Sequence, residues 1–180
     1  LLKLVDKFCE AYDGVVFCDQ ASNYRGKFRV LPALVCHLTR YDSPCRKLDV
    51  LIHIGEISGA YMGFWANQVW RVSPDGEVCD VFRKLRYVFE MEEKAFFKRY
   101  VENAPKQAAE PAFIKEWLNE SERISGKVPE LPFSNIWIAQ QTAAKLPDGC
   151  VLSGRFFAHT VSLQGIKCAK RTGKERVAWN

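Results

Sequence analysis

The sequence predicts an α/β protein with a doubly wound, mostly parallel sheet, and three observations support this fold class. Helix-like and strand-like segments alternate along residues 1–55. The strand-like segments 15–19 and 48–55 are continuous apolar runs, as expected for strands that are buried on both faces. The second run leads directly into a loop bracketed by Gly55 and Gly59, at the end of the strand where open parallel sheets bind ligands.

The helices are predicted from apolar residues that recur at the 3.6-residue period. Residues 1–12 carry Leu1, Leu4, Val5, Phe8 and Cys9 on one stripe, which ends before Asp13 and Gly14. We expect further helices at 30–38 (with Pro32 near its start), 59–67, 91–104, 111–125 and 133–149. In the helix at 111–125 the expected apolar face consists of Phe113, Ile114, Trp117 and Leu118. Ser134 is the expected N-cap of the last helix.

The remaining strands are predicted around turn residues. Residues 68–82 contain two strand-like runs separated by the turn Ser73–Gly76, and residues 85–90 and 150–154 are further strand candidates. Residues 103–112 have the composition of a linker. We place a domain boundary near residue 130, so that residues 1–130 form a central α/β domain and residues 131–180 begin an incomplete second domain.

Composition excludes several classes of protein. With 48% hydrophobic and 26% charged residues, the chain is typical of a globular protein. Its apolar runs are shorter than the roughly 18 residues of a membrane span, so we expect a cytoplasmic protein without a membrane partner. The net charge of +5 comes mostly from the last residues of the chain, a distribution that argues against a nucleic-acid partner.

The cysteines and histidines give no metal site. The seven cysteines are scattered without a C-x-x-C pair, which predicts reduced and mostly buried thiols rather than zinc ligands. His53 lies within an apolar run and is expected to be a core residue. His37 and His159 have no Cys, Asp or Glu at a metal-ligand spacing.

The candidate site is the loop Gly55–Gly59. Its glycines permit a tight turn, Glu56 is a candidate ligand group, and Ser58 is either an N-cap or a ligand group. The spacing is not that of a dinucleotide fingerprint, and the chain has neither a P-loop nor a G-x-S-x-G motif. The residues alone therefore predict an α/β domain with a ligand crevice and no identified activity.

Three segments resemble a known family. The runs LDVLIHIGEISG, WRVSPDGEVCDVFRKLRYVFEMEEKAFFKRY and FSNIWIAQQTAAKLPDGCVL are similar to the middle domain, and the entry into the last domain, of thiamine-diphosphate enzymes. Among these, the chain most resembles the SEPHCHC synthases of menaquinone biosynthesis, transferases that add a decarboxylated 2-oxoglutarate unit to isochorismate. The resemblance covers roughly residues 1–152.

The resemblance implies a non-catalytic, Rossmann-like central domain. The thiamine diphosphate and Mg²⁺ of such an enzyme would be held by flanking pyrimidine and diphosphate domains across a subunit interface, in a homodimer or homotetramer. This chain would then hold no catalytic, cofactor-binding or metal-binding residue. Gly55, Glu56, Ser58, Gly59 and Arg155 would face the substrate entrance.

The sequence also departs from the family pattern. Ala60 and Tyr61 stand where the family commonly has a lysine, so the resemblance supports the enzyme type more strongly than the substrate. Two alternatives remain open. The crevice formed by residues 19–26 and Gly55–Gly59 binds a nucleotide or regulatory ligand, or the domain is structural and binds no ligand.

Overall fold

The computed structural model describes residues 1–18, 24–36, 42–55, 63–105 and 110–127, together with scattered positions between 129 and 145. Within this part of the chain, no helix is both long enough and apolar enough to cross a membrane. The predicted strand at 150–154 and most of the predicted helix at 133–149 lie outside the described residues.

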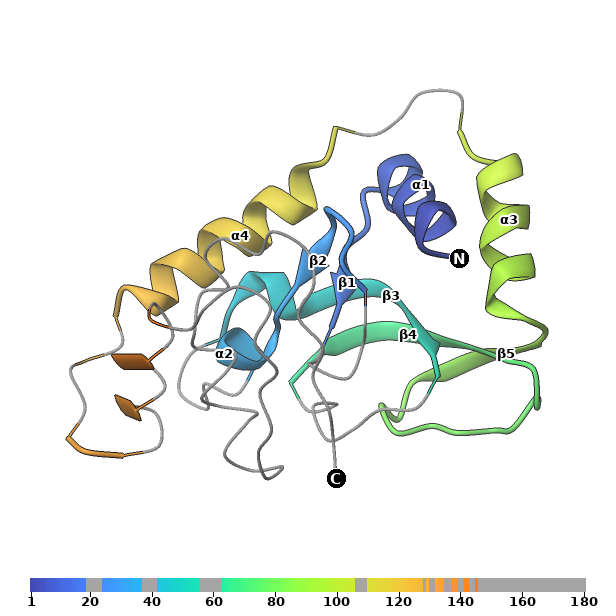
Figure 1. The fold of residues 1–180 in the computed structure, drawn as a ribbon. Helices are drawn as coiled ribbons and strands as arrows, with labels where there is room; N and C mark the ends of the chain where they lie inside the picture. The colour runs from blue at the N-terminus through green and yellow to red at the C-terminus, as the bar shows by residue number, and fades with distance from the viewer. Residues whose placement is uncertain are drawn as a thin grey trace.

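The described strands are all parallel and form two sheets (Figure 1). The larger sheet has the order β3 (Lys47–Ile54), β4 (Trp65–Ser73) and β5 (Leu85–Glu90). The smaller sheet pairs β1 (Val16–Phe17) with β2 (Arg29–Val30). The prediction of an α/β protein with mostly parallel strands is therefore confirmed.

The elements of the described residues include four α-helices and one short 3-10 helix. They are α1 (Leu2–Tyr12), α2 (Ala33–Cys36), the 3-10 helix η1 (Pro44–Arg46), α3 (Glu93–Glu102) and α4 (Ala112–Ser125). The four α-helices lie within the segments predicted as helical, because their apolar residues follow the 3.6-residue period. The capping prediction is also confirmed, since the Ser134 Oγ accepts a hydrogen bond from the Trp137 N–H at 3.2 Å.

Helices α1 and α3 pack against each other through aromatic rings and together reach β4. The Phe8 ring meets Phe97 edge to face at 5.3 Å between centroids, and Tyr100 lies 6.0 Å from Trp70 of β4. Figure 1 shows the two helices on the same side of the larger sheet. The helix pair therefore covers the face of β4 from which Trp70 projects.

Helix α4 belongs to the main core although a linker-like segment precedes it. Trp117 is fully buried, and its ring meets Phe17 of β1 edge to face at 5.0 Å. The Phe113 N–H donates to the Asp13 carboxylate at 3.0 Å and so joins the start of α4 to the end of α1. The two residues are 100 positions apart, and patterns in the sequence report only on neighbouring residues, so they do not predict this contact.

Three secondary-structure predictions are wrong. Arg29 and Val30, expected in a loop and at the start of a helix, form β2 and pair with β1. Residues 77–84 form no strand, so the run after Ser73–Gly76 does not fold back on β4. Instead these residues form a loop in which Asp80 Oδ1 accepts hydrogen bonds from the N–H groups of Lys84 and Leu85. The loop leads into β5, which runs parallel to β4. Likewise Trp65–Asn67, expected at the end of a helix, forms the start of β4, because these residues pair with β3.

Two burial predictions also need correction. In β3 Asp49 and Ile54 are exposed, so the strand is not buried on both faces, and the reason is its position at the edge of the sheet. In α4 Leu118 is 54% exposed, whereas Ile124 is buried and was not in the predicted face. The buried residues of α4 are Ile114, Trp117 and Ile124, and Leu118 lies about 100° around the helix from Trp117.

We expect Trp117→Ala to lower the free energy of unfolding by about 3–5 kcal/mol, because it leaves a cavity between α4 and β1. Urea unfolding followed by circular dichroism measures the change. Leu118→Ala is the matched control on the same helix and should change stability by no more than about 0.5 kcal/mol. Equal losses in the two variants would contradict the placement of α4 on the core.

Candidate functional site

The structure describes one of the five predicted site residues. Gly55 directly follows β3 and has a positive φ of 63°, the left-handed conformation that favours glycine. Nothing lies within 4 Å of the position that a Cβ would occupy, so the conformation, and not crowding, favours glycine here. Glu56, Ser58, Gly59 and Arg155 lie outside the described residues.

A buried arginine fixes the position of Gly55. Arg71 of β4 is 1% exposed, and its Nη1 donates to the Gly55 carbonyl at 3.5 Å. Its Nε donates to the Glu77 carbonyl at 3.1 Å, and its Nη2 lies 3.9 Å from the Asp75 carboxylate. One guanidinium therefore ties the end of β3 to the loop that follows β4.

The turn after β4 is organised by its own polar groups. The Asp75 carboxylate accepts a hydrogen bond from the Glu77 N–H at 2.7 Å, and this bond, followed by one from Ser73, lowers the pKa of Asp75. The Ser73 carbonyl accepts from the N–H groups of Gly76 and Met91, each at 3.3 Å. The turn is thus joined to the end of β5 as well.

We call Gly55, Arg71, Ser73–Glu77 and Met91 the carboxyl-end corner, because they gather where β3, β4 and β5 end. Sequence reasoning found Gly55 and the turn but missed Arg71. The available signal was an arginine inside the apolar run Val69–Val72, because a charge in a buried strand requires partners. The corner holds a loop in a fixed position, and its one hydroxyl–carboxylate pair, Ser73 with Asp75, belongs to the turn.

His53 is a core residue, as predicted. It is 5% exposed, and its ring meets Phe82 edge to face at 5.8 Å between centroids. Phe82 comes from the loop between β4 and β5, so this contact holds the loop against the strand that carries His53. The histidine therefore has a packing role beneath the carboxyl-end corner.

The described cysteines are free, and four of the five are buried, which confirms that prediction for this part of the chain. Burial raises the pKa of the Cys9 thiol to about 12, with further contributions from the Asp6 and Glu10 carboxylates. Burial likewise raises the pKa of Cys36 to about 12, although the positive charge of Arg46 acts to lower it. Among the described residues, no three His, Cys, Asp or Glu side chains are grouped as metal ligands would be.

The loop after β1 is described only from Tyr24 onward. The Tyr24 hydroxyl donates to Asp6 Oδ1 at 2.5 Å, and Gly26 lies directly over this bond, so that a Cβ there would overlap both partners. Burial and the Asp6 hydrogen bond raise the pKa of Tyr24. These contacts anchor the loop to α1, and the nucleotide-binding alternative stays a prediction because residues 19–23 lie outside the described part.

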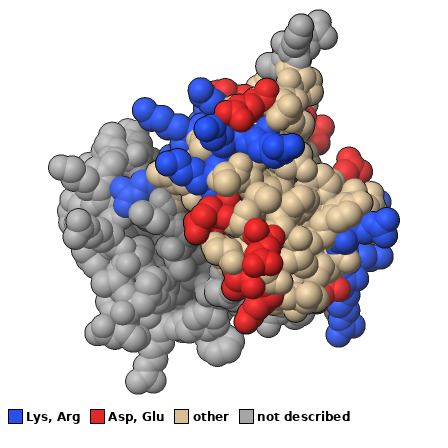
Figure 2. All heavy atoms as spheres, turned by 90° about the vertical axis from the view of Figure 1, so that its right-hand side faces the viewer, with Lys and Arg blue, Asp and Glu red and all other residues tan. Residues whose placement is uncertain are grey.

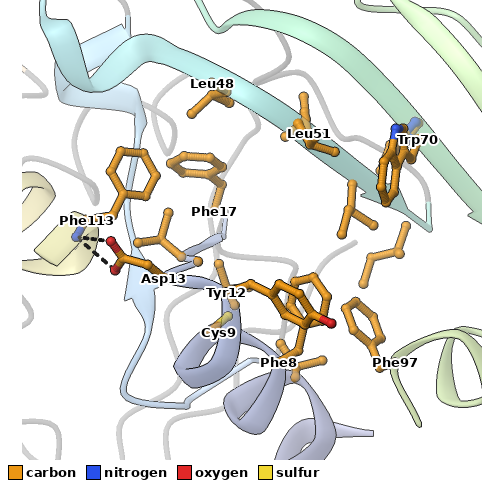
Figure 3. Close-up of a pocket in the computed structure, with 18 of the residues that line it drawn as sticks. Phe8, Cys9, Tyr12, Asp13, Phe17, Leu48, Leu51, Trp70, Phe97 and Phe113 are labelled. Carbon is orange, nitrogen blue, oxygen red and sulfur yellow. Dashed lines mark hydrogen bonds between the residues drawn. The ribbon is translucent and has the colours of Figure 1, made fainter. Parts of the chain in front are cut away.

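A large cavity lies between α1, β1 and β3 (Figure 3). Its volume is about 1140 Å³, and most of its lining is apolar. In Figure 3 the side chains of Phe8 and Tyr12 from α1 and of Leu48 and Leu51 from β3 surround it. Of the described residues that line it, Asp13, Lys47, Asp49 and Glu116 are charged.

On the face seen in Figure 2, basic side chains gather along the upper part. Basic and acidic side chains both occur on this face, with a broad uncharged area beside them.

Comparison with known proteins returned no matching family model and no matching curated protein.

We expect Arg71→Lys to lower the free energy of unfolding by about 2 kcal/mol, because an ammonium group cannot reproduce the guanidinium's separate bonds to Gly55 and Glu77. Chemical denaturation measures the loss. Arg86→Lys on exposed β5 is the control and should leave stability unchanged. The placement of Arg71 is wrong if both variants behave alike.

Alkaline pH should unfold the protein through its buried thiols. With the pKa of Cys9 and Cys36 raised in the folded state, the unfolded chain loses protons above pH 9.0 that the folded chain keeps. The free energy of unfolding should therefore fall by about 1.4 kcal/mol per pH unit per thiol as pH rises from about 9 towards 12. Urea unfolding measured across this pH range tests the prediction. The Cys9→Ala variant should reduce the slope of the free energy of unfolding against pH by the contribution of one thiol. An unchanged slope in that variant would refute the assignment.

Proposed function

We propose that this chain is the central-domain part of a thiamine-diphosphate-dependent synthase related to the SEPHCHC synthases. In this proposal the chain contributes a doubly wound layer that supports subunit assembly in a reducing, cytoplasmic setting. The thiamine diphosphate and Mg²⁺ are bound by pyrimidine and diphosphate domains that flank it. The parent enzyme is a transferase that adds a decarboxylated 2-oxoacid unit to an acceptor, as in menaquinone biosynthesis.

The observation that carries the proposal is the carboxyl-end corner. The motifs behind the family resemblance are far apart in the sequence: the strand ending at Gly55, the turn Ser73–Gly76, and the helix containing Phe96 and Phe97. In the structure Arg71 bonds the first of these to the loop after the second. The third follows β5, which pairs with β4 beside the same turn.

The position of the corner is favourable for a substrate entrance. Loops at the carboxyl ends of parallel strands line the crevice of an open α/β sheet, and Gly55 opens such a loop. Arg71 uses its donors inside the protein, so it supports the loop and leaves substrate contact to the residues that follow Gly55. In this proposal Glu56, Ser58, Gly59 and Arg155 face the entrance.

A domain exchange tests the proposal. Residues 1–127 replace the corresponding span of an authentic SEPHCHC synthase, and the chimera is assayed for thiamine diphosphate binding and for adduct formation from 2-oxoglutarate and isochorismate. We expect cofactor binding to be retained and activity to be reduced, because Ala60 and Tyr61 replace the usual lysine region. The same host carrying an unrelated parallel α/β domain is the control and should bind no cofactor. A folded, dimeric chimera without cofactor binding would contradict the proposal.

The isolated chain provides a second measurement. Titration with thiamine diphosphate and Mg²⁺ should give no heat of specific binding, because this chain supplies neither cofactor-binding domain. A rise in melting temperature with ADP, NAD, FAD or coenzyme A would instead favour the nucleotide-binding alternative. Tight binding of thiamine diphosphate would refute the domain assignment.

A further inference from the structure

In the part of the chain that the structure describes, two sheet edges are open on either side of the cavity. Among the described residues, β3 pairs only with β4 and β1 pairs only with β2, so each is the outer strand of its sheet. An outer strand presents a row of backbone N–H and C=O groups without strand partners. The cavity of about 1140 Å³ is lined by residues of both outer strands.

The pattern of lining residues shows that the cavity lies at these edges. Successive side chains of a strand point to opposite faces of its sheet, so a cavity above one face is lined by every second residue. Here the consecutive residues 47–54 of β3 all line the cavity, and so do the consecutive residues 14–18 around β1. Only a cavity beside the strand, at the level of its backbone, meets both faces in this way.

The size of the cavity corresponds to one missing strand. A strand residue within a layered sheet occupies about 160 Å³, from the strand spacing, the layer spacing and the rise per residue. The cavity therefore accommodates about seven residues of extended chain. This length is close to that of β3, which has 8 residues.

The lining sets the chemistry of the occupant. Val5, Phe8 and Tyr12 of α1, with Phe97 and Tyr100 of α3, give the cavity an apolar wall. A central strand of a parallel sheet is apolar throughout, because helices cover both of its faces. The cavity thus fits an uncharged strand of β-branched and small residues.

The order of the strands indicates where the occupant comes from. Doubly wound sheets have the order 3-2-1-4-5-6, in which the first strand lies between the second and the fourth. With β1 and β2 as the second and third strands, and β3, β4 and β5 as the fourth to sixth, the cavity is at the position of the first. That strand would lead into α1, whose Leu1 and Leu2 also line the cavity.

We propose that the cavity is the seat of a sixth, central parallel strand, supplied by a segment joined to the amino end of α1. The strand pairs with β1 on one side and β3 on the other and unites the two sheets into one. Its connection through α1 to β1 is then a βαβ unit, for which the right-handed crossover is nearly universal. This inference rests on the cavity and the two edges and does not depend on the proposed function.

An extension at Leu1 tests the proposal. Seven apolar residues, Val-Ile-Val-Val-Ala-Val-Ala, followed by Gly-Asn-Ser-Gly, are placed before Leu1, and amide hydrogen exchange of residues 15–17 and 48–54 is measured. We expect exchange to slow at least tenfold in the extended protein at the alternate positions whose N–H faces the cavity, such as Val15 and Phe17, because the Val16 N–H already bonds to the Phe28 carbonyl. The control has proline at alternate positions of the seven, so that the segment cannot donate to either edge. Equal exchange in the extended and control proteins would overturn the proposal.

Two further measurements separate this occupant from others. The extended protein is examined by size exclusion, and protection that appears only in a dimer would overturn the proposal in favour of a second copy. Binding of anilinonaphthalene sulfonate to the cavity should be seen in the unextended protein and lost in the extended one. Retained binding at full strength would indicate a small-molecule pocket and also overturn the proposal. If the extension prevents folding, the same seven residues with a lysine tail, added as a free peptide, must reproduce the slowed exchange.

Discussion

The parallel pairing of β3 with β4 is the interaction on which the rest of the structure depends. Its register runs from Lys47 opposite Trp65 to Ile54 opposite Val72, and it brings the two strands to an end at the same edge of the sheet. Because the strands run in the same direction, Gly55 and the turn after Ser73 become neighbours. Arg71 can then bond both, and the carboxyl-end corner follows from the register.

Much of the fold could be predicted because its elements have local signatures. The stripe of α1, the aromatic face of α3 and the apolar run of β3 each follow a period set by backbone geometry. The wrong secondary-structure predictions lie in segments whose structure is determined by contacts with residues elsewhere in the fold. Trp65–Asn67 pairs with β3, and residues 77–84 are held by Asp75 and Asp80 in a loop, although both segments contain residues that favour other structures.

The candidate site was predictable only in part. Gly55 has a clear signal, since a glycine after an apolar run marks the carboxyl end of a buried strand. Arg71 has a weaker one, because a single sequence does not show which carbonyl groups a buried guanidinium will meet. The cavity has no local signal at all. It arises from the absence of pairing between β1 and β3, which is a property of the assembled strands.

The open edge of β3 has a consequence for how the isolated chain behaves in concentrated solution. Exposed strand edges recruit the edges of other molecules, and natural proteins counter this with charged side chains. Lys47 and Asp49 are the exposed charged residues of β3. At this edge their charges oppose the pairing of β3 with a strand of another molecule, which is the role of gatekeeper residues.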